Sequence, residues 1–166
     1  MPVIDRIGDI FEQDWTVLAH GCNCFNTMGA GVARQVKLHF PEAFAVDQQA
    51  NRHATARKYG STFDLLGTFS MVAFDEDAPP ERRGKRVYNL YTQYNYGLDR
   101  SHIDYFSLEK AMKKMRWDLR HDRVYREAKI AMPKIGCGLA GGEWRIVREI
   151  IGSVFYDQDA RIYSLE

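Results

Sequence analysis

The sequence lacks long apolar runs and a surplus of charge of either sign. No stretch approaches the roughly 18 apolar residues of a membrane-spanning helix, and the charged segment 1–9 does not look like a secretory signal. Lys and Arg number 23 against 22 Asp and Glu, so the formal net charge is +1. A general nucleic-acid binder carries a strongly basic face. The balance therefore disfavours that class, although a local basic site remains open.

Cysteine is also scarce, with only Cys22, Cys24 and Cys137. An odd number without a disulfide framework indicates a reducing compartment, so we expect a cytoplasmic protein. The three thiols and His20 could form a zinc site. However, the C-x-C spacing differs from the usual C-x-x-C, and small buried thiols are the favoured interpretation. We expect neither a metal nor a cofactor.

Repeats, low-complexity tracts and linkers are absent, so residues 1–166 should form a single, monomeric domain. The patterns predict strands at 1–4, 15–19, 65–74, 86–93, 129–135 and 161–165, and helices at 30–40, 41–59, 107–119 and 143–153. The polar turn at 75–85 makes the strands on either side a candidate hairpin. Interleaved strands and helices predict a three-layer α/β/α sandwich around a mixed, largely parallel sheet.

Two segments share one design, a buried strand followed by a glycine-rich loop and a helix start. They are residues 17–36 (VLAHGCNCFNTMGAGVARQV) and 130–147 (IAMPKIGCGLAGGEWRIV). Loop N–H groups and helix N-termini attract phosphate, and such loops lie at the carboxyl ends of strands, where ligands bind. Two facing loops would hold a diphosphate. Neither is a dinucleotide or P-loop motif, because Arg34 replaces the third glycine and no G-K-[ST] follows.

Four motifs, in the right order over nearly the whole chain, resemble the macro domain family, which binds ADP-ribose. They are G-D-I at 8–10, H-G-C-N at 20–23, G-A-G-V at 29–32 and PKIGCGLAG at 133–141. The residues in these motifs are most similar to those of the subgroup of ADP-ribose 1″-phosphate phosphatases and ADP-ribosyl hydrolases, some of them viral or bacterial. The resemblance implies ADP-ribose or a derivative as ligand, with ADP-ribosylated macromolecules as possible partners.

The resemblance also implies roles for individual residues. Asp9 would accept a hydrogen bond from the adenine amino group, Ile10 would pack against the base, and Asn23 would hold the distal ribose. The diphosphate would lie along the backbone of the first loop at Gly29, Ala30, Gly31 and Val32. The second loop would close over it with Gly136, Cys137, Gly138, Leu139, Ala140 and Gly141.

The sequence departs from the family at three positions, the first of which is His20, in place of the first asparagine of the family's N-A-A-N. The aromatic residue of the second loop falls at Ala140, and Tyr94, Tyr96 or Phe25 could compensate. Gln93 replaces the lysine of the lysine-dependent ADP-ribosyl hydrolases, and their acidic residue also falls at Ala140. A covalent lysine mechanism is therefore disfavoured.

The catalytic candidates are His20, Asn23 and Glu143. His20 opens the first loop and could act as a general acid or base, or bind a terminal phosphate; the alternative is a histidine that only hydrogen-bonds the loop. Glu143 begins the helix after the second loop, where the helix dipole favours its charge, and a simple first-turn acid is the preferred interpretation. Asp9 could alternatively cap its own turn.

Two further segments carry open alternatives. The basic stretch of Lys110, Lys113, Lys114, Arg116, Arg120 and Arg123 is most simply a solvated helix face, and nucleic-acid binding there is a minor hypothesis. The Tyr-rich segment 91–97 could stack on a ligand or simply end a strand.

We expect an enzyme that hydrolyses ADP-ribose 1″-phosphate. The alternatives are removal of ADP-ribose from protein or nucleic acid, and non-catalytic binding of ADP-ribose.

Overall fold

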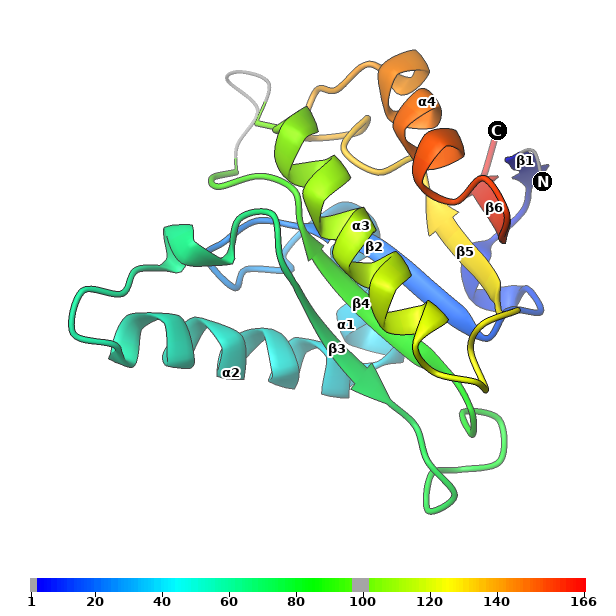
Figure 1. Cartoon of the computed structure of the whole chain (residues 1–166), viewed down its shortest axis with the longest axis horizontal. Coiled ribbons are helices and arrows are strands. Elements are labelled where there is room, and N and C mark those ends of the chain that lie inside the picture. The colour runs from blue at the N-terminus through cyan, green and yellow to red at the C-terminus, as the bar shows by residue number, and fades with distance from the viewer. Residues whose placement is uncertain (1–2, 97–101) are drawn as a thin grey trace.

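A six-stranded sheet forms the centre of the computed structural model, which describes residues 3–96 and 102–166 (Figure 1). Residues 1–2 of the expected first strand and residue 97 of the Tyr-rich segment lie outside these ranges. The strands follow the order β1-β6-β5-β2-β4-β3 across the sheet. They are β1 (Ile4–Ile7), β2 (Val17–Cys22), β3 (Phe69–Ala73), β4 (Arg86–Tyr91), β5 (Lys129–Pro133) and β6 (Asp159–Ser164). All neighbours are parallel except the β3–β4 pair, so the mixed, largely parallel sheet is confirmed.

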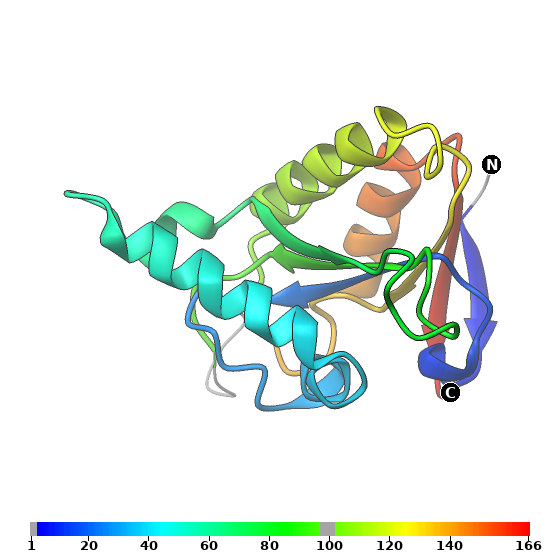
Figure 2. The same cartoon turned by 90° about the horizontal axis from the view of Figure 1, so that it is seen from below.

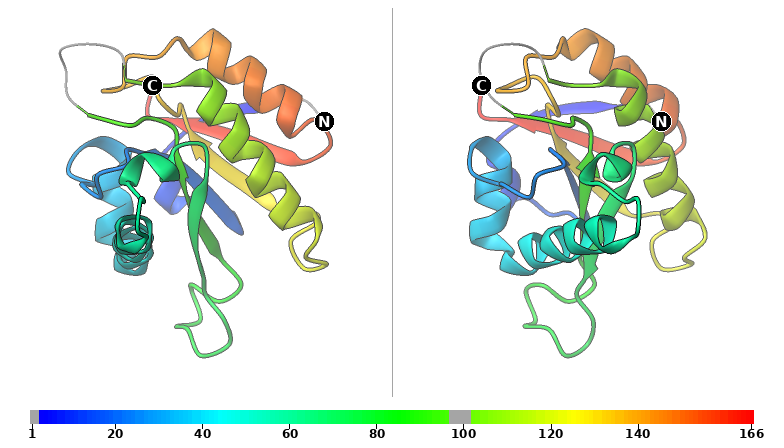
Figure 3. Two further views of the ribbon diagram at one scale, coloured as in Figure 1. Left: turned by 60° about the vertical axis from the view of Figure 1, so that its left-hand side comes forward. Right: turned by 90° about the vertical axis from the view of Figure 1, so that its left-hand side faces the viewer.

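Helices cover both faces of this sheet, which confirms the three-layer sandwich. They are α1 (Gly31–His39), α2 (Pro41–Ala56), α3 (Tyr105–Arg120) and α4 (Trp144–Val154), with short 3-10 helices η1 (Ile10–Glu12) and η2 (Thr62–Leu65). α1 and α2 lie on one face, and α3 and α4 lie side by side on the other (Figures 2 and 3). No helix in the described ranges is both long and apolar enough to span a membrane.

The core confirms the helical faces expected from the apolar spacing. Leu108, Ala111, Met112 and Met115 of α3 are fully buried in one cluster with Val147 and Ile151 of α4. A second cluster on the opposite face joins η1 and α1 to the sheet. Pro41 begins α2 at its first turn, where its missing N–H costs nothing.

Some strand boundaries differ from expectation. β1 begins at Ile4, where the expected strand ended, and β2 continues to Cys22, so His20 lies inside a strand. β3 starts only at Phe69, because residues 62–65 form η2 with a capping box from Ser61. The expected hairpin is present, since β3 and β4 pair in antiparallel register.

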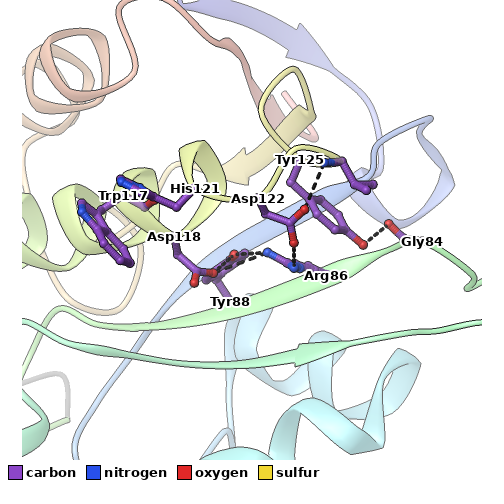
Figure 4. Close-up of polar contacts among 9 residues, drawn as sticks. Gly84, Arg86, Tyr88, Trp117, Asp118, His121, Asp122 and Tyr125 are labelled. Atoms are coloured by element: carbon purple, nitrogen blue, oxygen red, sulfur yellow. Dashed lines mark hydrogen bonds and ion pairs between the residues drawn. The ribbon is translucent and has the colours of Figure 1, made fainter.

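A polar network attaches the C-terminal end of α3 to β4 (Figure 4). The Arg86 guanidinium pairs with Asp122 and lies 3.5 Å from Asp118. The Tyr88 hydroxyl donates to the same Asp118 carboxylate at 2.5 Å. These part-buried charge-assisted contacts fix the orientation of α3 against the sheet.

Candidate functional site

The two glycine-rich loops leave the sheet side by side. β2 and β5 are parallel neighbours, with Val17 opposite Ile130, so both strands end at the same edge. The first loop, residues 23–30, leads into α1, and the second loop, residues 134–143, leads into α4. A Cβ placed on Gly31 would lie 3.9 Å from Cδ1 of Leu139. The structure thus brings both loops together; we call residues 23–32 and 134–143 the loop pair.

The first loop is shaped by its own side chains. The Asn23 side-chain amide donates to Thr27 Oγ1 at 2.7 Å, and its carbonyl oxygen accepts the Phe25 N–H at 2.8 Å. Asn26 and Met28 have positive φ angles of 57° and 39°. Non-glycine residues rarely take this conformation unless the surroundings hold them there. Asn23 therefore maintains the turn that presents residues 29–32.

Asp47 of α2 anchors this loop, a role the sequence analysis missed. Its buried carboxylate accepts hydrogen bonds from Asn26 Nδ2 at 2.8 Å, from the Tyr91 hydroxyl at 2.7 Å and from Asn51 at 3.2 Å. Burial raises the pKa of the Asp47 carboxyl. The available signal was its spacing, because Asp47 lies four residues after Ala43, on the buried face of α2.

Close packing shapes the second loop and explains several of its glycines. A Cβ on Gly136, whose φ is +73°, would lie 1.9 Å from Cδ1 of Ile103. One on Gly142 would lie 2.6 Å from the Gly136 carbonyl oxygen, which also accepts the Gly142 N–H. Gly138 differs, since nothing lies within 4 Å of its Cβ position. Gly138 is therefore the open point of the second loop.

The remaining residues of the second loop differ in exposure. Leu139 is about half exposed and Ala140 is buried. The half-buried Cys137 thiol donates to the Ile135 carbonyl. Gly141 has a φ of +73°, and its N–H donates to the Gly138 carbonyl. These contacts close the loop into a compact turn beneath Gly138 and Leu139.

His20 is wholly buried within β2, a placement that favours the structural alternative over a general acid or base at a bound phosphate. Its Nε2 lies 2.7 Å from Oδ1 of Asn89, whose amide donates to the Ala43 carbonyl and to Ser70 Oγ. Burial lowers the pKa of His20 to about 4, so the ring is neutral at pH 7. The physical reason is the greater length of β2, which places His20 within the sheet beneath α2.

Asp9 and Ile10 lie at the start of η1. Asp9 is exposed and its Oδ1 accepts the Phe11 N–H at 2.9 Å, so the capping contact considered as the alternative is present. Ile10 is 6% exposed and belongs to the same cluster as Val32, the last residue of the G-A-G-V motif. η1 and the first loop are thereby joined through shared packing.

Glu143 lies at the junction of the second loop and α4. Its side chain is exposed and forms no capping hydrogen bond, while its N–H donates to the Tyr105 hydroxyl at 2.9 Å. Glu143 is thus an acidic group at the edge of the loop pair. Gln93, at the position of the family's lysine, donates through its amide to the Asn95 carbonyl.

Aromatic rings and thiols complete the surroundings of the first loop. Phe25 packs on Tyr94 and Tyr96 with ring centroids 4.9 and 6.3 Å apart, and all three are partly exposed. Cys22 and Cys24 are buried, as the favoured interpretation expected, and burial raises the pKa of Cys24 to about 12. Across residues 3–96 and 102–166, no group of three or more His, Cys, Asp or Glu side chains could hold a metal ion.

Sequence comparison identifies relatives over most of the chain, although no family model matches it. An uncharacterised 17.5 kDa protein of Enterobacteria phage T4 is 30% identical over 134 residues, which cover 81% of this chain and 76% of that protein. A DNA ADP-ribosyl transferase–DNA ADP-ribosyl glycohydrolase fusion protein of Thermosipho africanus is 29% identical over 144 residues. That match covers 84% of this chain but only 35% of the relative. An ADP-ribose 1″-phosphate phosphatase of Debaryomyces hansenii is 22% identical, with 91% and 89% covered.

Solved structures share the fold. The macrodomain of Mycobacterium tuberculosis DarG superposes with a TM-score of 0.74 at 23% identity, covering 97% of this chain and 96% of that one. A macrodomain protein from Streptomyces coelicolor gives the same TM-score at 21% identity, with 98% of each chain covered. The chain therefore has the fold of the macrodomain family.

Proposed function

We propose that this chain binds ADP-ribose between the two loops and hydrolyses a derivative substituted at the distal ribose. The observation that carries the proposal is the juxtaposition of Gly31 and Leu139, which belong to the loop pair that follows two parallel strands. It offers backbone N–H groups and helix N-termini to one diphosphate. The adenine amino group would donate to Asp9, and Asn23 would contact the distal ribose. The solved structure of Thermosipho africanus DarTG, which superposes with a TM-score of 0.72, is a complex with ADP-ribose and supports this choice of ligand.

ADP-ribose 1″-phosphate is the first candidate substrate. A water oxygen would bond to phosphorus while the bond from phosphorus to the ribose 1″ oxygen breaks, and that oxygen would take up a proton. Because His20 is buried and neutral, the exposed Glu143 carboxylate is the acidic group we assign to orient the water. Loop N–H groups would stabilise the developing charge.

Removal of ADP-ribose from a macromolecule is the second candidate. The name of the Thermosipho fusion protein includes a DNA ADP-ribosyl glycohydrolase and favours it. A Mycobacterium tuberculosis relative, 27% identical over 165 residues, is also named as a DNA ADP-ribosyl glycohydrolase. The chain spans 35% and 40% of those proteins, so only part of each is shared. With Gln93 in place of the lysine, this chain would use water directly to break the glycosidic bond.

One experiment separates these candidates from non-catalytic binding. Purified protein is incubated with ADP-ribose 1″-phosphate, an ADP-ribosylated protein and an ADP-ribosylated oligonucleotide, and released phosphate and ADP-ribose are measured. We expect phosphate from the first substrate, and a Glu143→Gln variant should release it at least about tenfold more slowly. Release of ADP-ribose alone would favour the second candidate. Binding of ADP-ribose without any release would leave a reader, and absence of binding would overturn the proposal.

A further inference from the structure

The outward face of α3 takes no part in the core or in the loop pair. Phe106 is 75% exposed near its start, and Trp117 is 63% exposed near its end. A hollow of about 390 Å³ lies along this face, lined by Phe106, Glu109, Lys110, Lys113, Lys114 and Trp117. Single exposed rings are common, but two rings that line one hollow form a gathered apolar surface, which is typical of a binding site.

The charge of this surface is positive. Lys113 lies 3.5 Å from Glu109, an exposed pair of small energetic value. Within the part of the chain that the structure describes, neither Lys110 nor Lys114 forms an ion pair. Two ammonium groups are therefore available to an anionic partner between the two rings.

The Trp117 ring is held in place before any partner arrives. It stacks on His121 with ring centroids 3.9 Å apart and an interplanar angle of 22°, and His121 Nδ1 lies 2.7 Å from the Trp117 carbonyl oxygen. Figure 4 shows both rings beside Asp118, which the network of Arg86 fixes against the sheet. A ring that is already ordered loses little entropy on binding.

We propose that this face of α3 binds a single-stranded nucleic acid. Bases would stack on Phe106 and Trp117, and the phosphates between them would pair with Lys110 and Lys114. A single-stranded nucleic acid suits both the rings and the ammonium groups, because every base offers a flat face for stacking and every phosphodiester carries a negative charge. Eleven residues of helix span roughly 16 Å, enough for several nucleotides.

The surface also begins next to the loop pair. The Tyr105 hydroxyl, one residue before Phe106, accepts the N–H of Glu143 in the second loop. A strand that lies on α3 therefore passes the edge of the proposed ADP-ribose site. The inference does not depend on that site, since it concerns unmodified nucleic acid.

Fluorescence anisotropy tests the proposal with the full chain and labelled oligothymidylate or oligouridylate of about twelve nucleotides, within the range of known single-strand sites. We expect saturable binding that weakens steeply with salt. Trp117→Ala, and separately Lys110→Glu with Lys114→Glu, should weaken binding at least about fivefold. Trp117→Phe should retain most of it. Thermal melting checks that each variant is folded.

Matched controls lie on α2 and just beyond it, across the sheet. Tyr59 is 89% exposed and has the Lys58 ammonium 5.4 Å from its ring, so Tyr59→Ala removes an aromatic that is even more exposed than Trp117. Arg52→Glu with Lys58→Glu makes the same change in net charge. Both controls should bind like the wild type. Equal losses in the controls would show a general charge effect and overturn the proposal.

Two further outcomes would also overturn it. One is the absence of binding at low salt. The other is self-association in light scattering that Trp117→Ala abolishes while oligonucleotides fail to compete, which would make a second copy the partner. Calorimetry with ADP-ribose keeps the two proposals apart. If oligonucleotide binds but ADP-ribose does not, the function proposed for the loop pair fails and this surface stands.

Discussion

The imidazole of His20 and the side-chain amide of Asn89 are 2.7 Å apart and wholly buried, so the pair lies inside the sheet rather than at the mouth of the first loop. The amide oxygen needs a donor, which the neutral ring supplies through Nε2. The amide nitrogen extends the contact to α2 through the Ala43 carbonyl. His20 thus contributes to the attachment of α2 to the sheet, and its effect on a ligand would be indirect.

Burial of His20 predicts a specific loss of stability in acid. Its pKa is about 4 in the folded chain against an ordinary 6.5. Between these values the unfolded chain binds a proton that the folded chain does not, so the free energy of unfolding falls as the pH falls from 6.5 towards 4. The full effect is about 3 kcal/mol.

Urea denaturation of the wild type and His20→Gln at several pH values measures this contribution. The variant lacks the titrating group, so its stability should fall less over the same window. The quantity compared is the slope of the free energy of unfolding against pH. The difference between the two slopes is free of the cost of altered packing and of the titration of groups that both proteins share. Parallel slopes for the two proteins would show that His20 is not held neutral.

The open position of Gly138 predicts that charge, rather than bulk, blocks the loop pair. No φ strain and no neighbour within 4 Å oppose a side chain there. Gly138→Glu places a carboxylate where we expect the diphosphate and should weaken ADP-ribose binding at least about tenfold. Gly138→Gln, of the same size, should bind much better than Gly138→Glu. If calorimetry finds wild-type affinity in Gly138→Glu, the diphosphate does not lie between the loops.

Asp9 offers a way to separate its cap from its proposed contact with adenine. Asp9→Asn keeps the oxygen that accepts the Phe11 N–H but loses the charge, whereas Asp9→Ala loses both. Loss of a charge-assisted hydrogen bond costs roughly 1.5–3 kcal/mol, so both variants should bind ADP-ribose about tenfold or more weakly. Only Asp9→Ala should also lose stability, by about 1 kcal/mol. Undiminished affinity in Asp9→Asn would place the adenine elsewhere.

The Asp47 anchor predicts a coupling between stability and ligand binding. Asp47→Asn replaces one carboxylate oxygen with an NH2 group, so the side chain can no longer accept hydrogen bonds from both Asn26 and the Tyr91 hydroxyl. The free energy of unfolding of the variant should fall by about 1–3 kcal/mol. Asn26→Gly keeps the positive φ but cuts the tie, so it should weaken ADP-ribose binding with a smaller loss of stability. Asn51→Ala, which removes a contact within α2, should leave affinity unchanged.

Local patterns were sufficient for the helices but not for the end of β2. The spacing of Leu108, Met112 and Met115 correctly predicted the buried face of α3, because residues three or four positions apart lie on the same side of a helix and here pack into one core. By contrast, H-G-C-N reads as a loop, yet residues 20–22 continue the strand because they pair with Asn89, Leu90 and Tyr91. Pairing with a distant strand outweighed the local preference of Gly21.

In the candidate site, too, local sequence predicted some features, whereas others depend on contacts between distant residues. The position of the two loops followed from motifs that are contiguous in the sequence. The anchor of the first loop could not be foreseen, because Asp47 meets Asn26 and Tyr91 only through the packing of α2 on the sheet. Burial at His20 was hidden for a similar reason, since it depends on how far β2 and β4 run together.

The pairing of β1 with β6 has a consequence for biosynthesis. β1 is the first strand in chain order, yet Ile4 lies opposite Arg161 and Ile7 opposite Ser164. A nascent chain must therefore keep β1 unpaired until β6 has left the ribosome. Closing so long a loop slows folding. A prematurely terminated product that ends before Asp159 would lack β6, leaving β1 without its partner and one edge of β5 uncovered.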